Sequence, residues 1–208
     1  LGKSTIPLGI DGVIAMGLFR LDALLVAALR GNSDLAVYAV AYRLLETVLF
    51  VAFAIVAALF AVMSASDALQ RIRATVERGL TVGAAVYVPF AIAVGLRGSG
   101  ILRIMFGAQY ASAAAAPLAW LGPTPLLVAF GNLATVALIA RHRVKGAVLA
   151  SLAALVANVI LNLALIPPFG PTGAAIANTA AYGLEAIILA VLCTRLFGFP
   201  RVDRALLE

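Results

Sequence analysis

Residues 146–166 read GAVLASLAALVANVILNLALI, and residues 174–197 read AAIANTAAYGLEAIILAVLCTRLF. Each run is predominantly apolar over the roughly 20 residues that a helix needs to cross the hydrocarbon core of a bilayer. The seven residues between them, PPFGPTG (167–173), end one helix because proline cannot continue it. The pattern therefore predicts a transmembrane helical hairpin.

The rest of the chain has the same character. Its 208 residues are 64% hydrophobic and 12% charged, with a mean hydropathy of +1.10, whereas a soluble domain is about 45–50% apolar and about 25% charged. These values exclude a soluble enzyme and a disordered chain. Because the apolar runs are continuous rather than alternating, they predict helices and not a β-barrel. We expect an all-α polytopic membrane protein with six spans, at about 5–29, 36–63, 79–96, 112–139, 146–166 and 174–197.

The basic residues indicate how the six spans are oriented. One set of alternate loops and termini holds ten lysines and arginines: Lys3, Arg71, Arg73, Arg78, Arg141, Arg143, Lys145, Arg195, Arg201 and Arg204. The other set holds three: Arg30, Arg97 and Arg103. Cytoplasmic loops carry the excess of positive charge, so both termini are expected in the cytoplasm and the protein in the cell membrane. The net charge of +6 thus reflects topology, and no nucleic-acid partner is expected.

Catalytic and cofactor chemistry finds little support in the sequence. Cys193 is the single cysteine and lies in an apolar run, which excludes a disulfide framework and a cysteine metal site. His142, the single histidine, lies in a basic turn. There is no nucleophile elbow, P-loop or metal-ligand spacing. We expect a protein that is not an enzyme and that has no metal and no cofactor.

Because the sequence starts at Leu1 and leads directly into a span, it reads as a fragment.

Six ionisable residues lie inside the predicted spans, where each costs roughly 2.5–3.5 kcal/mol on insertion scales. They are Asp11, Arg20, Asp22, Arg43, Glu46 and Glu185. Asp22 and Arg43 lie at equal depth on the two sides of the turn at 30–35, so an ion pair between them is plausible, either as a structural lock or beside a substrate site. Arg20 points away from Asp22, and Glu46 is its candidate partner. Glu185 lies near the midplane, as expected of an ion-coupling or switching residue.

The last three spans carry polar side chains on single helix faces. The spacing of three or four residues, or of seven, places each set on one face. The sets are Asn132 with Thr135, Ser151 with Asn158 and Asn162, and Asn178 with Tyr182 and Glu185. For the asparagines, the favoured interpretation is hydrogen bonding between helices, worth about 0.6 kcal/mol each.

Four short stretches resemble a known family. They are LFRLD (18–22), VYAVAYRLLE (37–46), MFGAQY (105–110) and NVILNLALIP (158–167), the last followed by GAAIA (173–177). In this order they resemble the seventh and later helices of polysaccharide and lipid-linked oligosaccharide flippases, members of the multidrug/oligosaccharidyl-lipid/polysaccharide exporter superfamily. The extra prolines Pro168 and Pro171, and the absence of a glycine before Tyr38, depart from the family pattern.

The resemblance implies that residues 1–208 form a single six-helix lobe, the C-terminal one of a two-lobe exporter whose N-terminal lobe is missing here. It implies a polyprenyl-diphosphate-linked oligosaccharide as the substrate, with Arg20 and Arg43 as substrate-binding residues, since arginine offers a planar fork to phosphate. Asp22, Glu46 and Glu185 are candidates for ion coupling or switching. The bilayer and the missing lobe are the other expected partners.

Three alternatives stay open at this point. A multidrug and toxin extrusion exporter, which moves cations and uses membrane acids, suits Asp11, Asp22 and Glu185 better. A lipid II flippase is a closer variant of the favoured function. A membrane-embedded glycan enzyme is disfavoured, because such enzymes usually carry large extracytoplasmic loops and the predicted loops on that side are short.

Overall fold

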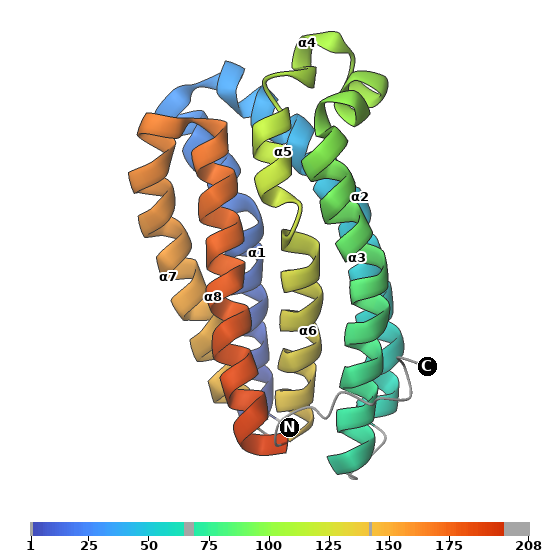
Figure 1. Ribbon diagram of the computed structural model, residues 1–208. Coiled ribbons are helices and arrows are strands. Elements are labelled where there is room, and N and C mark those ends of the chain that lie inside the picture. The colour runs from blue at the N-terminus through green and yellow to red at the C-terminus, as the bar shows by residue number, and fades with distance from the viewer. Residues whose placement is uncertain (1, 65–68, 142, 198–208) are drawn as a thin grey trace.

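The computed structural model describes residues 2–64, 69–141 and 143–197, and every secondary-structure element in them is a helix. The prediction of an all-α protein is therefore confirmed (Figure 1). The helices are α1 (Gly2–Arg30), α2 (Asn32–Ser64), α3 (Leu69–Phe106), α4 (Ala108–Ala111), α5 (Ala115–Leu121), α6 (Thr124–Ala140), α7 (Val144–Phe169) and α8 (Pro171–Phe197).

Four helical segments of the described chain are long and apolar enough to cross a membrane: Arg73–Phe106, Ala115–Ala140, Val144–Phe169 and Pro171–Leu196. Large apolar side chains also cover the outer surface, among them Phe50, Leu96 and Ile104, which are 76%, 77% and 88% exposed. Such a surface suits lipid rather than water. The chain is thus a multi-pass membrane protein, while the count of six spans stays a prediction.

Several boundaries differ from the predicted ones. The expected break at 97–111 is mostly helical, because α3 continues past one non-helical residue, Arg97, and ends only before Gly107, whose φ is +91°. Residues 69–78, which lie between the predicted spans 36–63 and 79–96, form the first turns of α3. Helix α7 includes Pro167 and Pro168 in its last turn and ends at Phe169, because Gly170 then adopts a φ of +55°.

The predicted span 112–139 consists of two helices, α5 and α6, which are separated by Gly122 and Pro123. Proline has no N–H to donate to the preceding turn, so the helix breaks there. The hydroxyl of Thr179 on α8 donates to the carbonyl of Trp120 at 2.7 Å and lies 2.9 Å from the hydroxyl of Thr124. These bonds satisfy a backbone carbonyl next to the break, as an apolar surrounding requires.

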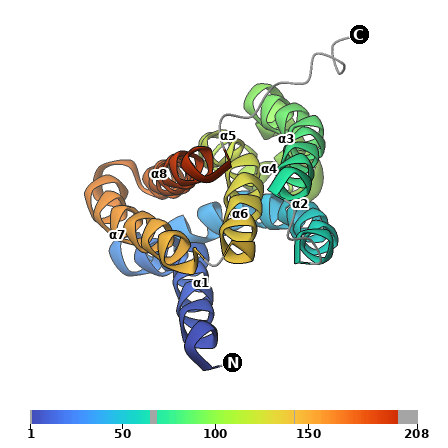
Figure 2. The ribbon, with the colours of Figure 1, turned by 90° about the horizontal axis from the view of Figure 1, so that it is seen from below.

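The turns alternate between the two ends of the bundle. The α1–α2 turn, α4 and the α7–α8 turn lie at one end, and the N-terminus and the α6–α7 connection lie at the other (Figure 1). Figure 2 shows α6 near the centre, with α7 and α8 on one side and α2 and α3 on the other. This alternation is the one that the lysine and arginine count assumes; which end faces the cytoplasm stays a prediction.

Candidate functional site: a polar cavity between five helices

A cavity of about 390 Å³ opens between α1, α2, α6, α7 and α8. Its apolar lining comes from Met16, Leu18, Phe53 and Val128. Its polar lining comes from Arg20, Asn132, Thr135, Ser151, Tyr182 and Glu185. A cavity of this size falls in the range of about 300–1,000 Å³ that is usual for ligand pockets, and its few polar groups can fix the orientation of a ligand.

Part of each predicted polar face of the last three spans lines this cavity, whereas Asn158, Asn162 and Asn178 are not among the described lining residues. Asn132 and Thr135 reach it from α6, Ser151 from α7, and Tyr182 and Glu185 from α8. The Ser151 hydroxyl donates a hydrogen bond of 2.7 Å to Oε1 of Glu185. Since the two residues are on different helices, this bond fixes the direction of the Glu185 side chain along the wall of the cavity.

Arg20 reaches the cavity from α1 and forms the predicted contact with α2. Its Nη1 lies 3.2 Å from Oε1 of Glu46, which confirms Glu46 as its partner. The other carboxylate oxygen, Oε2, lies 4.0 Å from Nη1 of Arg43. The side chains of Arg20 and Arg43 are 63% and 75% exposed, whereas that of Glu46 is 20% exposed. Arg43 is not among the described residues that line the cavity.

The predicted ion pair between Asp22 and Arg43 is wrong: although both residues are in the described part of the chain, no such pair forms. Asp22 is fully buried and accepts hydrogen bonds from the Tyr38 hydroxyl and, at 2.7 Å, from Nδ2 of Asn178. Although Asp22 and Arg43 lie at equal depth in the hairpin, depth does not determine the direction in which each side chain points. Asp22 points into the bundle, toward α2 and α8, and Arg43 points outward.

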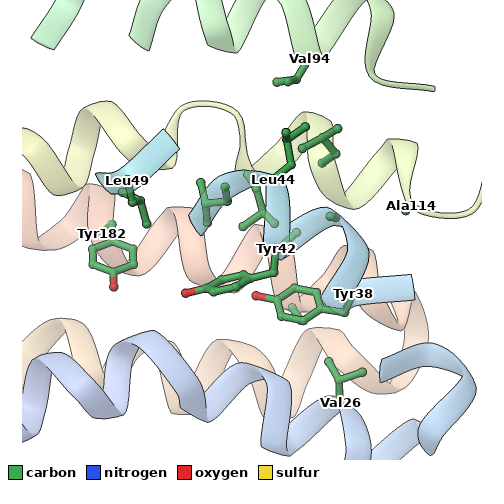
Figure 3. Packing of buried hydrophobic residues seen from close by; sticks show 14 of the residues in the cluster. Val26, Tyr38, Tyr42, Leu44, Leu49, Val94, Ala114 and Tyr182 are labelled. Carbon is green, nitrogen blue, oxygen red and sulfur yellow. The ribbon is translucent and has the colours of Figure 1, made fainter. Parts of the chain in front are cut away.

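Sequence reasoning gave no role to Tyr38, although it joins α2 to Asp22. Tyr38 and Tyr42 are four residues apart on α2, and their ring centroids are 5.5 Å apart. Figure 3 shows these two rings and that of Tyr182 in one row through the buried core. Two tyrosines at this helical spacing, opposite an aspartate in a hairpin, are the sequence signal that could have revealed the contact.

The asparagines behave in two ways. Asn178 joins α8 to α1 through Asp22, which confirms the interhelical role predicted for it. Asn162 instead bonds within α7, donating to the carbonyl oxygen and to Oδ1 of Asn158 at 2.9 Å each. Three buried atoms of the described residues have no hydrogen-bond partner: Asn158 Nδ2, Asn162 Oδ1 and Asn178 Oδ1.

The predictions for Asp11 and His142 stay predictions, because the side chain of the first and all of the second lie outside the described residues. The backbone of Asp11 lies in α1. Within the described part of the chain, no group of three His, Cys, Asp or Glu side chains is placed to hold a metal ion.

The comparison with known families shows the family to which the chain belongs. Residues 15–204, which include every residue that lines the cavity, match the family model described as lipid II flippase MurJ. This chain belongs to the MurJ family. The resemblance to flippases of the exporter superfamily is therefore confirmed.

Two similar proteins agree with membership of the MurJ family. The chain is 28% identical over 184 residues to the probable flippase AglR of Haloferax volcanii, an alignment that covers 86% of this chain and 38% of that protein. It also superimposes on a crystal structure of MATE in the bent conformation, with a TM-score of 0.69 and 20% identity, over 89% of this chain and 42% of that one. The second likeness shows the fold, and the chain spans less than half the length of either protein.

Proposed function

We propose that this chain forms one lobe of a flippase that carries a polyprenyl-diphosphate-linked glycan across the cytoplasmic membrane. The observation that carries this proposal is the position of Arg20 at a polar cavity in a chain of the MurJ family. A guanidinium offers several donors in a planar fork that matches phosphate oxygens. The hydroxyl and amide groups of Ser151, Thr135 and Asn132 supply donors and acceptors for a hydroxyl-rich glycan.

In this proposal, the chain and a second lobe enclose different parts of the substrate. A cavity of about 390 Å³ holds the diphosphate and the adjoining part of the head group, not a whole lipid-linked oligosaccharide. The second lobe would enclose the rest, and rocking of the two lobes would expose the site alternately to the two sides of the membrane. In this arrangement both termini of the chain lie in the cytoplasm.

Individual residues receive roles within this proposal. Arg20 binds the diphosphate from the cavity wall, and Arg43, which is 75% exposed, binds it from outside the wall as the substrate enters or leaves. Asp22, at the junction of α1, α2 and α8, and Glu185, held by Ser151, serve ion coupling or switching. Asp22 suits this role because a change in its charge acts on three helices at once.

A second candidate is a cation-coupled exporter of the multidrug and toxin extrusion type. Glu185 favours it, because this carboxylate lies in the cavity and could face a cationic substrate. Arg20 in the same cavity disfavours it, because like charges at a binding site repel.

Substrate choice tests the proposal. We expect the full-length protein in liposomes to move a polyprenyl-diphosphate-linked oligosaccharide or lipid II across the bilayer, and to leave a lipophilic cationic dye where it is. Parallel assays with the two glycolipids separate the two flippase variants. Movement of the dye without movement of either glycolipid would refute the proposed flippase function and support the function of a cation-coupled exporter.

A further inference from the structure

The contact between Arg20 and Glu46 joins the wall of the cavity to a carboxylate on the neighbouring helix. Arg20 is on α1 and lines the cavity, and Glu46 is on α2. Nη1 of Arg20 lies 3.2 Å from Oε1 of Glu46, and the arginine side chain remains 63% exposed. The guanidinium therefore contacts a carboxylate and still exposes a surface that a ligand can reach.

A second arginine shares the same carboxylate through its other oxygen. Nη1 of Arg43 lies 4.0 Å from Oε2 of Glu46. When Arg20 turns toward a ligand, Arg43 remains near the Glu46 carboxylate, which lowers the free-energy cost of breaking the ion pair between Arg20 and Glu46. The cost would be far greater if Glu46 had no second counter-ion, because an unpaired carboxylate is unfavourable in an apolar surrounding.

We propose that Glu46 is a positioning residue that holds Arg20 at the cavity and competes with the phosphate of the ligand for its guanidinium. The inference rests on the proposed function and adds that Glu46 sets the affinity of the cavity for the phosphate of its ligand. Carboxylates and phosphates accept hydrogen bonds from arginine in the same geometry, so each can replace the other. Competition of this kind weakens ligand binding and, because affinity differences arise mostly in the dissociation rate, speeds release.

The variant Glu46→Gln tests this inference, because it keeps the shape of the side chain and removes its charge. The probe is inorganic pyrophosphate, titrated calorimetrically at low ionic strength into the full-length protein. Because the arginine of this ion pair is 63% exposed, the pair contributes little, and we expect Kd to fall by about two- to fivefold. In liposomes the apparent KM for the glycolipid should fall with it, and the maximal rate should fall as well, because release is slower.

Two controls isolate the effect. Glu77→Gln removes one negative charge from another arginine–glutamate pair, Arg73 with Glu77 at 2.8 Å on α3, and should leave the Kd unchanged. In a background of Arg20→Gln, the change Glu46→Gln should tighten binding much less, because the guanidinium left for it to release is that of Arg43, whose Nη1 lies 4.0 Å from Oε2 of Glu46. Should Glu46→Gln not fold, Glu46→Asp retains the charge but shortens the reach, and a smaller fall in Kd is expected.

The outcomes separate this inference from the proposed function. If Arg20→Gln weakens pyrophosphate binding but Glu46→Gln leaves it equal or weaker, competition by Glu46 is refuted and the substrate role of Arg20 stands. Equal tightening by Glu77→Gln would also refute it, because the effect would then be one of net charge. If Arg20→Gln leaves pyrophosphate binding unchanged, the proposed substrate site and this inference both fall.

Discussion

Alanine in place of Gly173 is expected to destabilise the protein by about 3 kcal/mol, the upper end of the range usual for an overfilled close-packed site. A Cβ at this position would lie 2.1 Å from the carbonyl oxygen of Leu165 and 2.5 Å from its carbonyl carbon. Both are backbone atoms of α7, so no side-chain rotation relieves the clash. The tight turn at Gly170 joins the two helices directly and limits how far they can separate.

Thermal unfolding of the full-length protein in detergent checks this prediction. For a loss of this size we expect the melting temperature to fall by about 6–12 °C. Gly183→Ala is the matched control on the same helix, since no described atom lies within 4 Å of a Cβ placed there. There the better helix propensity of alanine should leave the melting temperature unchanged or slightly raised. Equal melting temperatures for the two variants would show that α7 and α8 do not pack as described.

The second large effect is expected at Arg20. Arg20→Gln removes the guanidinium from the cavity, and hydrogen bonds to charged groups contribute about 1.5–3 kcal/mol. Glycolipid flipping should therefore fall by about 10- to 100-fold. Arg20→Lys should recover only part of the rate, because an ammonium group cannot form the two parallel bonds of arginine. Because Glu46 keeps Arg43 within 4.0 Å, the variant leaves no isolated carboxylate and should fold.

Flipping is measured in liposomes with matched protein amounts, and folding by size-exclusion chromatography. The control is Arg73→Gln, which removes a partly buried arginine and breaks an ion pair of 2.8 Å on α3, away from the cavity residues. Its rate should remain close to that of the wild type. A normal rate for Arg20→Gln would remove this arginine from the substrate site.

Hydropathy predicted the helical class and the order of the helices, because the demand for about 20 apolar residues leaves a strong signal in the sequence. It did not predict where helices break in the membrane. The break between α5 and α6 lies inside an apolar run, where Gly122, Pro123 and Pro125 mark it. Conversely, the polar stretch near Arg103 is helical, since polar and charged residues do not themselves end a helix.

The site was predictable in part. Helical spacing correctly grouped Asn132 with Thr135 and Tyr182 with Glu185, because spacing fixes which side chains share a face. It could not show that these faces and Arg20 meet around one cavity, since that depends on how five helices pack. The pairing of Asp22 failed for the same reason: depth follows from residue number, whereas direction depends on packing with Asn178 on α8.

Two phenylalanines on α2 allow a direct test of whether the diphosphate head group of a glycolipid enters this cavity. Phe53 lines the cavity, whereas Phe50, one turn earlier and 76% exposed, is not among the described residues that do. Each is replaced in turn by photoreactive benzoylphenylalanine in the full-length protein, and a polyprenyl-diphosphate glycan labelled in its head group is added.

We expect position 53 to cross-link to the labelled head group, excess unlabelled glycolipid to suppress the product, and position 50 to give little cross-linking. Equal cross-linking at both positions, or cross-linking at position 50 alone, would contradict this expectation, because the head group would then lie on the outer surface of the protein and not in the cavity.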